Sequence, residues 1–174
     1  PYPQDGQGGR RAGASSQEAM MADLLSRMLA NGKTGLIDLN VNLKQRALSA
    51  GAYCSQQADY STLILSGRNR SGQSLEEVKD ILLEQVDLLK QGEFPDWMLE
   101  ATINNLKLFE MKRLESNFGR AWMMSSSFIN DISWKDAVEY NDKLSKITKD
   151  DLVKFANEHL TNNYVVVYKR LGTP

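Results

Sequence analysis

The feature that most constrains the fold is a dense series of helix signals from residue 74 onward. Ser74 and Glu77 form a capping box, in which the serine accepts a hydrogen bond from a free helix amide and the glutamate bonds back. Gly92 then ends the apolar pattern with a residue suited to the left-handed conformation. This pattern predicts a helix over 74–92 with one buried face. The apolar residues of that face are Val78, Ile81, Leu82, Val86 and Leu89.

Other stretches carry helix signals of the same kind. Ser15 and Glu18 make an earlier capping box, and the helix that they start should end at Asn31-Gly32. A shorter helix is predicted within Thr34–Arg46. The remaining predicted helices run from Pro95 to about Leu114, from about Gly119 to Ile129, from Ser133 with Asp136, and from Thr148 with Asp151 to about Leu160.

Only three stretches have the composition of strands. Ala52–Gln56 and Tyr60–Gly67 are separated by a short polar link, which predicts a hairpin with one partly exposed face. Tyr164–Lys169 is rich in β-branched and aromatic residues and predicts a third strand. Because runs of helices stand between few strands, we expect an α+β fold, with an antiparallel sheet covered by helices, rather than alternating βαβ units.

Length and composition favour one domain. The chain has 174 residues, of which 41% are apolar, enough for one sizeable core. Residues 1–14 are rich in Gly, Pro and Ser, so we expect a flexible lead-in followed by a single domain over 15–174. Because the chain starts at Pro1 without an initiator Met, we also expect it to be a piece of a longer protein.

Charge and cysteine content exclude several classes of function. Twenty-one basic residues stand against twenty-two acidic ones, without a long run of Lys or Arg, so nucleic acid is not an expected partner. The longest apolar runs fall far short of the ~20 residues that a membrane span needs. Cys54 is the only cysteine, which leaves no internal disulfide and no Cys-rich metal site. We expect it to be a buried spectator thiol.

The order of these patterns, from about Glu18 to Lys169, resembles the second, non-catalytic type of domain in the pitrilysin and insulinase family of zinc peptidases. The likeness lies in three stretches taken in order. They are Leu29–Gly32 before Thr34–Leu36, then Leu43–Tyr53 leading into the hairpin, and finally Ile147–Leu152 through to Tyr164–Tyr168.

The resemblance implies the fold of the LuxS/MPP-like metallohydrolases and a place in a larger assembly. In that family four homologous α+β domains enclose a chamber, and one of them contains the zinc motif. The chain would then be a zinc-free domain, inactive alone and without a cofactor of its own. Zinc would belong to the catalytic domain of the parent protein, and the partners would be its other domains and a peptide substrate.

The resemblance also implies that an N-terminal edge strand is missing from this chain. An exposed sheet edge would invite self-association.

Two alternatives stay open: a structural or assembly subunit related to these peptidases but without a zinc site, and an unrelated α+β domain that shares the pattern. An intact zinc motif elsewhere in the parent protein would favour the peptidase.

The stretch FANEH, residues 155–159, differs by one letter from H-x-x-E-H, the inverted zinc motif of this family. A catalytic zinc needs three protein ligands, and Phe155 stands where the first imidazole would be. His159 is the only histidine of the chain. We therefore expect no metal here: Phe155 should anchor a core-facing stripe, and His159 should cap the end of the helix.

Arg46 and Tyr53 form the candidate substrate-binding pair. The resemblance implies a role for them, because the matching region of the family carries an arginine and, seven residues later, a tyrosine that face the zinc site and hold substrate backbone. A guanidinium and a phenol can stabilise the oxyanion that develops when water attacks a peptide carbonyl. The simpler interpretation, a surface arginine and a strand tyrosine, is the favoured one from the residues themselves.

Three further groups of residues are given structural interpretations. Glu76, Glu77, Asp80 and Glu84 crowd one predicted helix and should form a solvated face rather than a metal site. Trp122, Met123 and Met124 are expected in the core rather than on a peptide-binding surface. Ser125–Ser127 has no base nearby in the sequence, so a nucleophilic serine is not expected.

Overall fold

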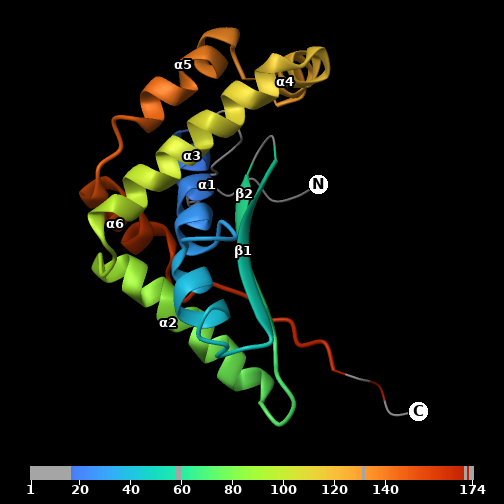
Figure 1. Ribbon diagram of the computed structural model, residues 1–174, viewed down its shortest axis with the longest axis vertical. Coiled ribbons are helices and arrows are strands. Elements are labelled where there is room, and N and C mark those ends of the chain that lie inside the picture. The colour runs from blue at the N-terminus through green and yellow to red at the C-terminus, as the bar shows by residue number, and fades with distance from the viewer. Residues whose placement is uncertain (1–16, 58–59, 131, 171, 173–174) are drawn as a thin grey trace, which may run out of the picture.

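The computed structural model describes residues 17–57, 60–130, 132–170 and 172. Helices gather on one side of a two-stranded sheet, which confirms the predicted α+β class (Figure 1). In chain order the elements are α1 (Gln17–Leu29), η1 (Asp38–Asn42), β1 (Ser49–Gln56), β2 (Ser61–Arg68), α2 (Leu75–Gln91), α3 (Asp96–Glu115), α4 (Asn117–Ile129), α5 (Trp134–Leu144) and α6 (Lys149–His159).

The helix ends follow the predicted capping chemistry. The backbone N–H of Glu77 donates to Ser74 Oγ over 3.1 Å, and the N–H of Ser74 donates to Glu77 Oε2 over 3.0 Å. Gly92 ends α2 at a φ of 70°, which a residue with a side chain rarely adopts. Thr148 and Asp151 make an equivalent box on α6. Ser15, residues 1–14 and the expected N-terminal edge lie outside the described residues.

The sheet is the predicted hairpin, with β1 antiparallel to β2. Ala52 lies opposite Leu65 on the face that packs against the helical core. Cys54 lies on the same face, where the charges of Asp23 and Arg27 on α1 affect its pKa. Because successive residues of a strand alternate in direction, Tyr53 and its partner Ile64 lie on the other face. In Figure 1 the helices that cover the hairpin lie on one side of it, and α4 lies beyond its upper end.

The predicted helix within 34–46 was wrong in its extent. Residues 36–42 are helical, most of them as the π-helical turn η1, and bends and turns flank them. Asp38 orders the loop before this turn, because its Oδ2 atom accepts hydrogen bonds from several backbone N–H groups of that loop. These donors, at 2.9–3.1 Å, are Asn31, Gly32, Lys33 and Gly35.

The predicted strand at Tyr164–Lys169 was also wrong, because these residues join no strand ladder in the described part of the chain. A strand requires hydrogen bonds from a neighbouring backbone, and composition does not supply that neighbour. The segment instead passes α2, where Arg170 forms an ion pair with Glu76 over 3.7 Å. Val165 and Val167 remain 89% and 87% exposed.

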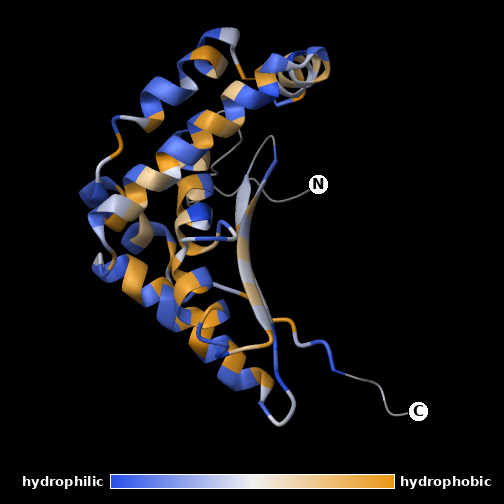
Figure 2. Ribbon diagram, viewed as in Figure 1, coloured by the Kyte–Doolittle hydropathy of each residue, from blue (hydrophilic) through white to orange (hydrophobic). Residues whose placement is uncertain are grey.

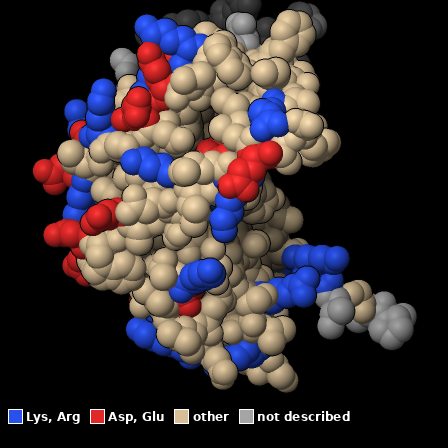
Figure 3. Space-filling view, turned by 45° about the horizontal axis from the view of Figure 1, so that its top comes forward, with Lys and Arg blue, Asp and Glu red and all other residues tan. Residues whose placement is uncertain are grey.

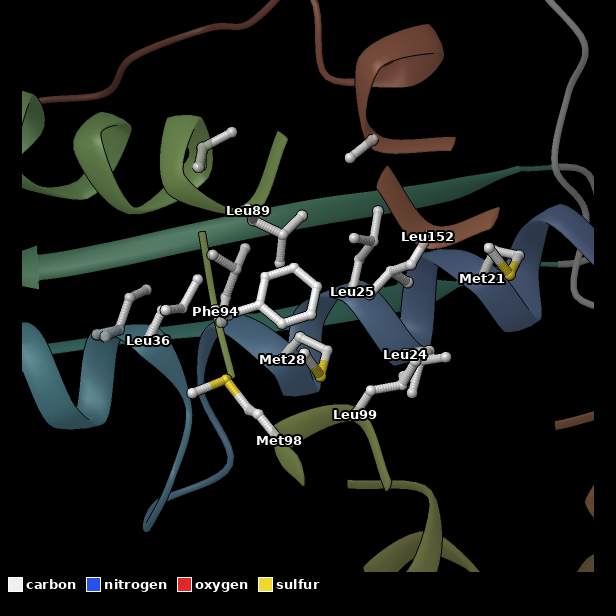
Figure 4. Close-up of a cluster of buried hydrophobic side chains, with 14 of the residues drawn as sticks. Met21, Leu24, Leu25, Met28, Leu36, Leu89, Phe94, Met98, Leu99 and Leu152 are labelled. Carbon is white, nitrogen blue, oxygen red and sulfur yellow. The ribbon is translucent and has the colours of Figure 1, made fainter. Parts of the chain in front are cut away.

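The core lies around α1, between the sheet and the outer helices (Figures 1 and 4). Leu24 and Leu25 of α1 are fully buried, and they meet apolar side chains from α2, α3 and α6. Among these are Leu89, Met98 and Leu152. The hydropathy colouring shows orange segments on the helix faces that meet here, but also at the far end of the molecule, near α4 (Figure 2).

Candidate functional site

Arg46 lies in the loop between η1 and β1, and its side chain points toward α2. Its guanidinium binds the Glu84 carboxylate through both oxygens, at 3.0 and 2.6 Å. The loop is held in place by Gln73, whose Nε2 donates to the Arg46 carbonyl oxygen over 2.8 Å. The pair stands at an open surface hollow of about 830 Å³, which is also lined by Arg70 and Asp80.

The electrostatics of this pair are those of a partly exposed ion pair. The hydrogen bond to Glu84 raises the pKa of Arg46, and the same bond lowers the pKa of Glu84. Both side chains are more than a third exposed, so water screens the attraction between them. Arg46 therefore stays charged, and its carboxylate partner stays ionised at neutral pH.

Tyr53 projects from the centre of β1 on the face of the sheet that the helices leave open, and it is 54% exposed. Gly51 shares that face, and a Cβ atom placed there would meet no atom within 4 Å. The structure thus gives Tyr53 a free neighbouring space on its own strand. It does not join Tyr53 to Arg46, since the guanidinium is turned toward α2 and the phenol away from the helices.

FANEH is the last turn and a half of α6. Leu152 and Ala156 are fully buried, and Phe155 is partly buried against the same core, as the apolar spacing predicted. His159 is exposed, and its ring lies 4.2 Å from the Phe155 ring. The carbonyl of Leu160 accepts a hydrogen bond from Lys90 Nζ over 3.0 Å, so this carbonyl at the helix end is capped by a residue of α2.

The acidic residues that crowd the N-terminal part of α2 make structural contacts. Glu77 belongs to the capping box, Glu84 binds Arg46, and Asp80 lies 3.1 Å from Lys79. Within the described ranges, no three His, Cys, Asp or Glu side chains gather in a way that could hold a metal ion. None of the described helices combines the length and the apolar content that crossing a bilayer demands.

The expected core position of Trp122 and Met124 was wrong, because each is 56% exposed. Their helix, α4, lies at one end of the molecule and packs against α3 and α5 rather than against α1 (Figure 1). The apolar spacing correctly predicted a helix here, but it wrongly predicted that the side carrying Trp122 and Met124 faces the core. A signal in the sequence marks the inner side: Gly119 and Ser127 are the buried residues of α4, and both are small.

No family model matches the sequence, and no curated protein matches it. Solved structures do match. A protease from Helicobacter pylori superposes with a TM-score of 0.79 and 22% identity, over 87% of this chain. The inactive peptidase domain of a proposed zinc protease from Bordetella parapertussis gives 0.76 and 15% identity, over 93% of this chain. A proposed zinc protease from Bordetella pertussis gives 0.74 and 14%, over 88%.

These likenesses show a shared fold. The chain spans 37% of the Helicobacter pylori protease, 89% of the Bordetella parapertussis domain and 84% of the Bordetella pertussis chain. The same fold therefore occurs both as about a third of a longer chain and as nearly the whole of a shorter one.

Proposed function

We propose that this chain is a non-catalytic domain of a zinc peptidase related to pitrilysin and insulinase, and that hydrolysis takes place in another domain of its parent protein. The observation that carries the proposal is the match to an inactive peptidase domain, which extends over 93% of this chain and 89% of that one. A match of this extent relates whole domains rather than a shared motif.

The chemistry of the described residues supports a non-catalytic role. Zinc catalysis needs three protein ligands around one open position. The position that would supply the first histidine of the inverted motif holds Phe155, whose ring packs against the core. His159, the remaining imidazole, lies exposed against that ring. Zinc in the parent's catalytic domain would polarise the peptide carbonyl and activate the attacking water.

We further propose that this domain forms part of the chamber wall and contacts peptide through Tyr53 and Arg46. The phenol can donate a hydrogen bond to a peptide carbonyl from the open sheet face, with the space beside Gly51 free for the peptide. Arg46 can act on the same substrate only by releasing Glu84, or by using the donors that Glu84 leaves free. Tyr53 is thus the stronger of the two candidates.

An assembly subunit without any zinc site in its parent is the second candidate. The exposed apolar side of α4 favours it, since large apolar surfaces on soluble proteins mark interaction sites. Both candidate functions predict that this chain does not hydrolyse peptides. They differ in whether a zinc motif stands elsewhere in the parent.

The first test is a zinc-binding measurement. The purified chain is equilibrated with Zn²⁺, dialysed against metal-free buffer and analysed for metal content. We expect no stoichiometric zinc and no peptide hydrolysis. One tightly retained zinc ion per chain would overturn the proposal, and replacement of His159 by Ala would then show whether FANEH holds it.

The second test addresses the peptide contact. Fluorescence anisotropy of a labelled, unstructured peptide should report weaker binding for Tyr53→Ala than for the wild-type chain. Tyr164→Ala is the matched control, because Tyr164 has a similar exposure, 51%, on a different segment. If both variants lost the same peptide affinity, or if Tyr53→Ala lost none, Tyr53 would be an ordinary strand residue without a role in peptide binding.

A further inference from the structure

Helix α4 is amphipathic in the reverse sense of an ordinary surface helix. Its buried residues are the small Gly119 and Ser127, whereas its large apolar side chains, apart from the partly buried Met123, are turned toward water. An amphipathic helix of a globular protein usually does the opposite. The outward side chains, here called the α4 apolar face, are Phe118 (78% exposed), Trp122 (56%), Met124 (56%), Phe128 (88%) and Ile129 (72%).

The orientation of α4 is fixed by its start. Ser116 Oγ accepts a hydrogen bond from the N–H of Gly119 over 2.9 Å. A Cβ atom on Gly119 would lie 1.9 Å from the Arg113 carbonyl oxygen, so the helix backbone approaches α3 more closely than any other residue would permit. Arg120 adds a bond to the Leu114 carbonyl over 2.7 Å. The apolar side is therefore held outward by a packed junction.

The α4 apolar face is large for a monomer. From the fractions exposed, its five side chains present roughly 700 Å² to water, against a largest patch of about 300–600 Å² on a typical monomer and about 800 Å² per partner in a standard interface. The rings of Phe118 and Trp122 already stack on each other, with centroids 6.4 Å apart. The face thus has almost the area that one side of a stable interface needs.

The composition of the face is compatible with pairing against a second copy of the chain. Counted outward from position 123, Phe118 corresponds to Phe128, Ala121 to Ser125 and Trp122 to Met124. Ile129 corresponds to the polar Asn117. Such a face is complementary to itself when two helices run antiparallel, with aromatic rings at both ends and small residues between them. We propose that two copies of this chain pair through α4, antiparallel, about a two-fold axis that passes between Ala121 and Ser125 on the exposed side of the helix.

Charge does not oppose this pairing. Arg120 is the only charged residue of α4, and it points toward the end of α3, where its guanidinium binds the Leu114 carbonyl. Charged side chains are also sparse in the upper right of Figure 3, the side on which Figure 1 places α4. A lipid surface fits less well, because an interfacial helix carries a basic polar side and the opposite side of α4 is packed against α3.

The test is sedimentation velocity of the purified chain from about 1 µM to about 200 µM, the range in which a pairing of modest affinity becomes visible. We expect a monomer–dimer equilibrium in the wild type, and at least a tenfold rise in the dissociation constant for Phe118→Glu and for Ile129→Glu. The matched control is Val167→Glu, because Val167 is apolar and at least as exposed as Phe118 and Ile129 but lies on the C-terminal segment. It should leave the equilibrium unchanged.

Each alternative occupant has its own outcome. A wild-type chain that stays monomeric at every concentration would overturn the proposal. So would a dimer that survives both α4 variants and is lost in Val167→Glu, which would place the contact on the C-terminal segment. Binding of the monomer to phosphatidylcholine vesicles, abolished by Phe118→Glu, would also overturn it and assign the face to lipid. Circular dichroism of each variant confirms that it is folded.

Cross-linking tests the antiparallel arrangement. In a Cys54→Ala background, a chain with Ala121→Cys is mixed with a chain with Ser125→Cys under mild oxidation. Antiparallel pairing places these two positions opposite each other, within the separation that a disulfide requires. We expect the mixed pair to form several times faster than either variant pairs with itself. Faster self-pairing of Ala121→Cys would indicate parallel helices and overturn the proposed geometry.

Discussion

Helices α1 and α4 have the same length, 13 residues, and both carry large apolar side chains at helical spacing. Their fates differ. In α1 the apolar residues are buried, with Leu24 and Met28 completely inaccessible, whereas in α4 the buried residues are Gly119 and Ser127. Apolar periodicity therefore predicts that a helix has an apolar face. The neighbouring elements determine whether that face packs against the core or remains available to a partner.

Position in the fold explains the contrast. α1 lies between the sheet and the outer helices, so every side of it can meet another element (Figure 1). α4 lies at the end of the helical layer and contacts α3 and α5. Apolar residues of α1 therefore stabilise this domain, while those of α4 remain for a contact outside it.

The largest effect should come from opening a cavity beneath α1. Leu24→Ala removes a side chain that is 0% exposed, and we expect it to lower the free energy of unfolding by about 3–4 kcal/mol. Urea denaturation followed by circular dichroism measures the change. A loss below about 1 kcal/mol would mean that α1 is packed more loosely than its burial indicates.

The reactivity of a cysteine thiol can be measured on the sheet face that α1 covers and on the α4 apolar face, and the two rates compared. Burial beneath α1, reinforced by the charge of Asp23 and partly offset by Arg27, raises the pKa of Cys54 to about 11. At pH 8 we expect Cys54 to be alkylated on the order of a hundred times more slowly than the cysteine in a Phe128→Cys variant. Mass spectrometry of digested chain, labelled at low protein concentration, gives both rates. Equal rates would remove the contrast between the two faces.

The loop that follows α1 should be the next most sensitive region. Asp38→Ala removes an acceptor that four backbone N–H groups share in the loop between α1 and η1, and of these the N–H of Lys33 keeps a second acceptor, Asn31 Oδ1. We expect a loss of about 2 kcal/mol in the free energy of unfolding. Asp38→Asn is the matched control, because its amide oxygen can still accept, and it should cost less. Equal losses would show that the charge, not the acceptor, holds the loop.

A smaller effect is expected from the exposed ion pair of Arg46 and Glu84. Arg46→Ala should change the free energy of unfolding by less than about 1 kcal/mol. Because the pKa of Glu84 is lower in the folded state, the contribution of the pair is present above the pKa of an unfolded glutamate and is lost as pH falls through the folded pKa. Wild type and variant should therefore differ at pH 7 and converge in acid. A difference that grew in acid would contradict this sign.

Local chemistry made much of the fold predictable. The capping boxes at Ser74 and Thr148 involve residues three apart, so the sequence contains both partners and the helix starts were predicted correctly. The hairpin of β1 and β2 was also predictable, because its two strands follow each other closely in the sequence. Asp38 was not, because its importance arises from backbone groups that a loop happens to bring to one oxygen.

The errors share a second cause, the dependence on distant partners. Tyr164–Lys169 has the composition of a strand, yet a strand forms only beside another backbone. Trp122 fits a core helix by spacing, but α4 is carried away from the core by the junction at Gly119. For the candidate site, the separation of Arg46 and Tyr53 was visible in the sequence, whereas the capture of Arg46 by Glu84 and the opposite direction of Tyr53 depend on the packing of α2.

The most direct test of the contrast between α1 and α4 is the free energy of unfolding of Phe128→Ala, measured at about 1 µM, where a dimer of modest affinity does not contribute. Phe128 is 88% exposed, so the substitution should change this free energy by no more than about 0.5 kcal/mol. A loss of about 3 kcal/mol, the cost of removing a buried phenylalanine, would contradict the account, because Phe128 would then belong to the core of the domain itself.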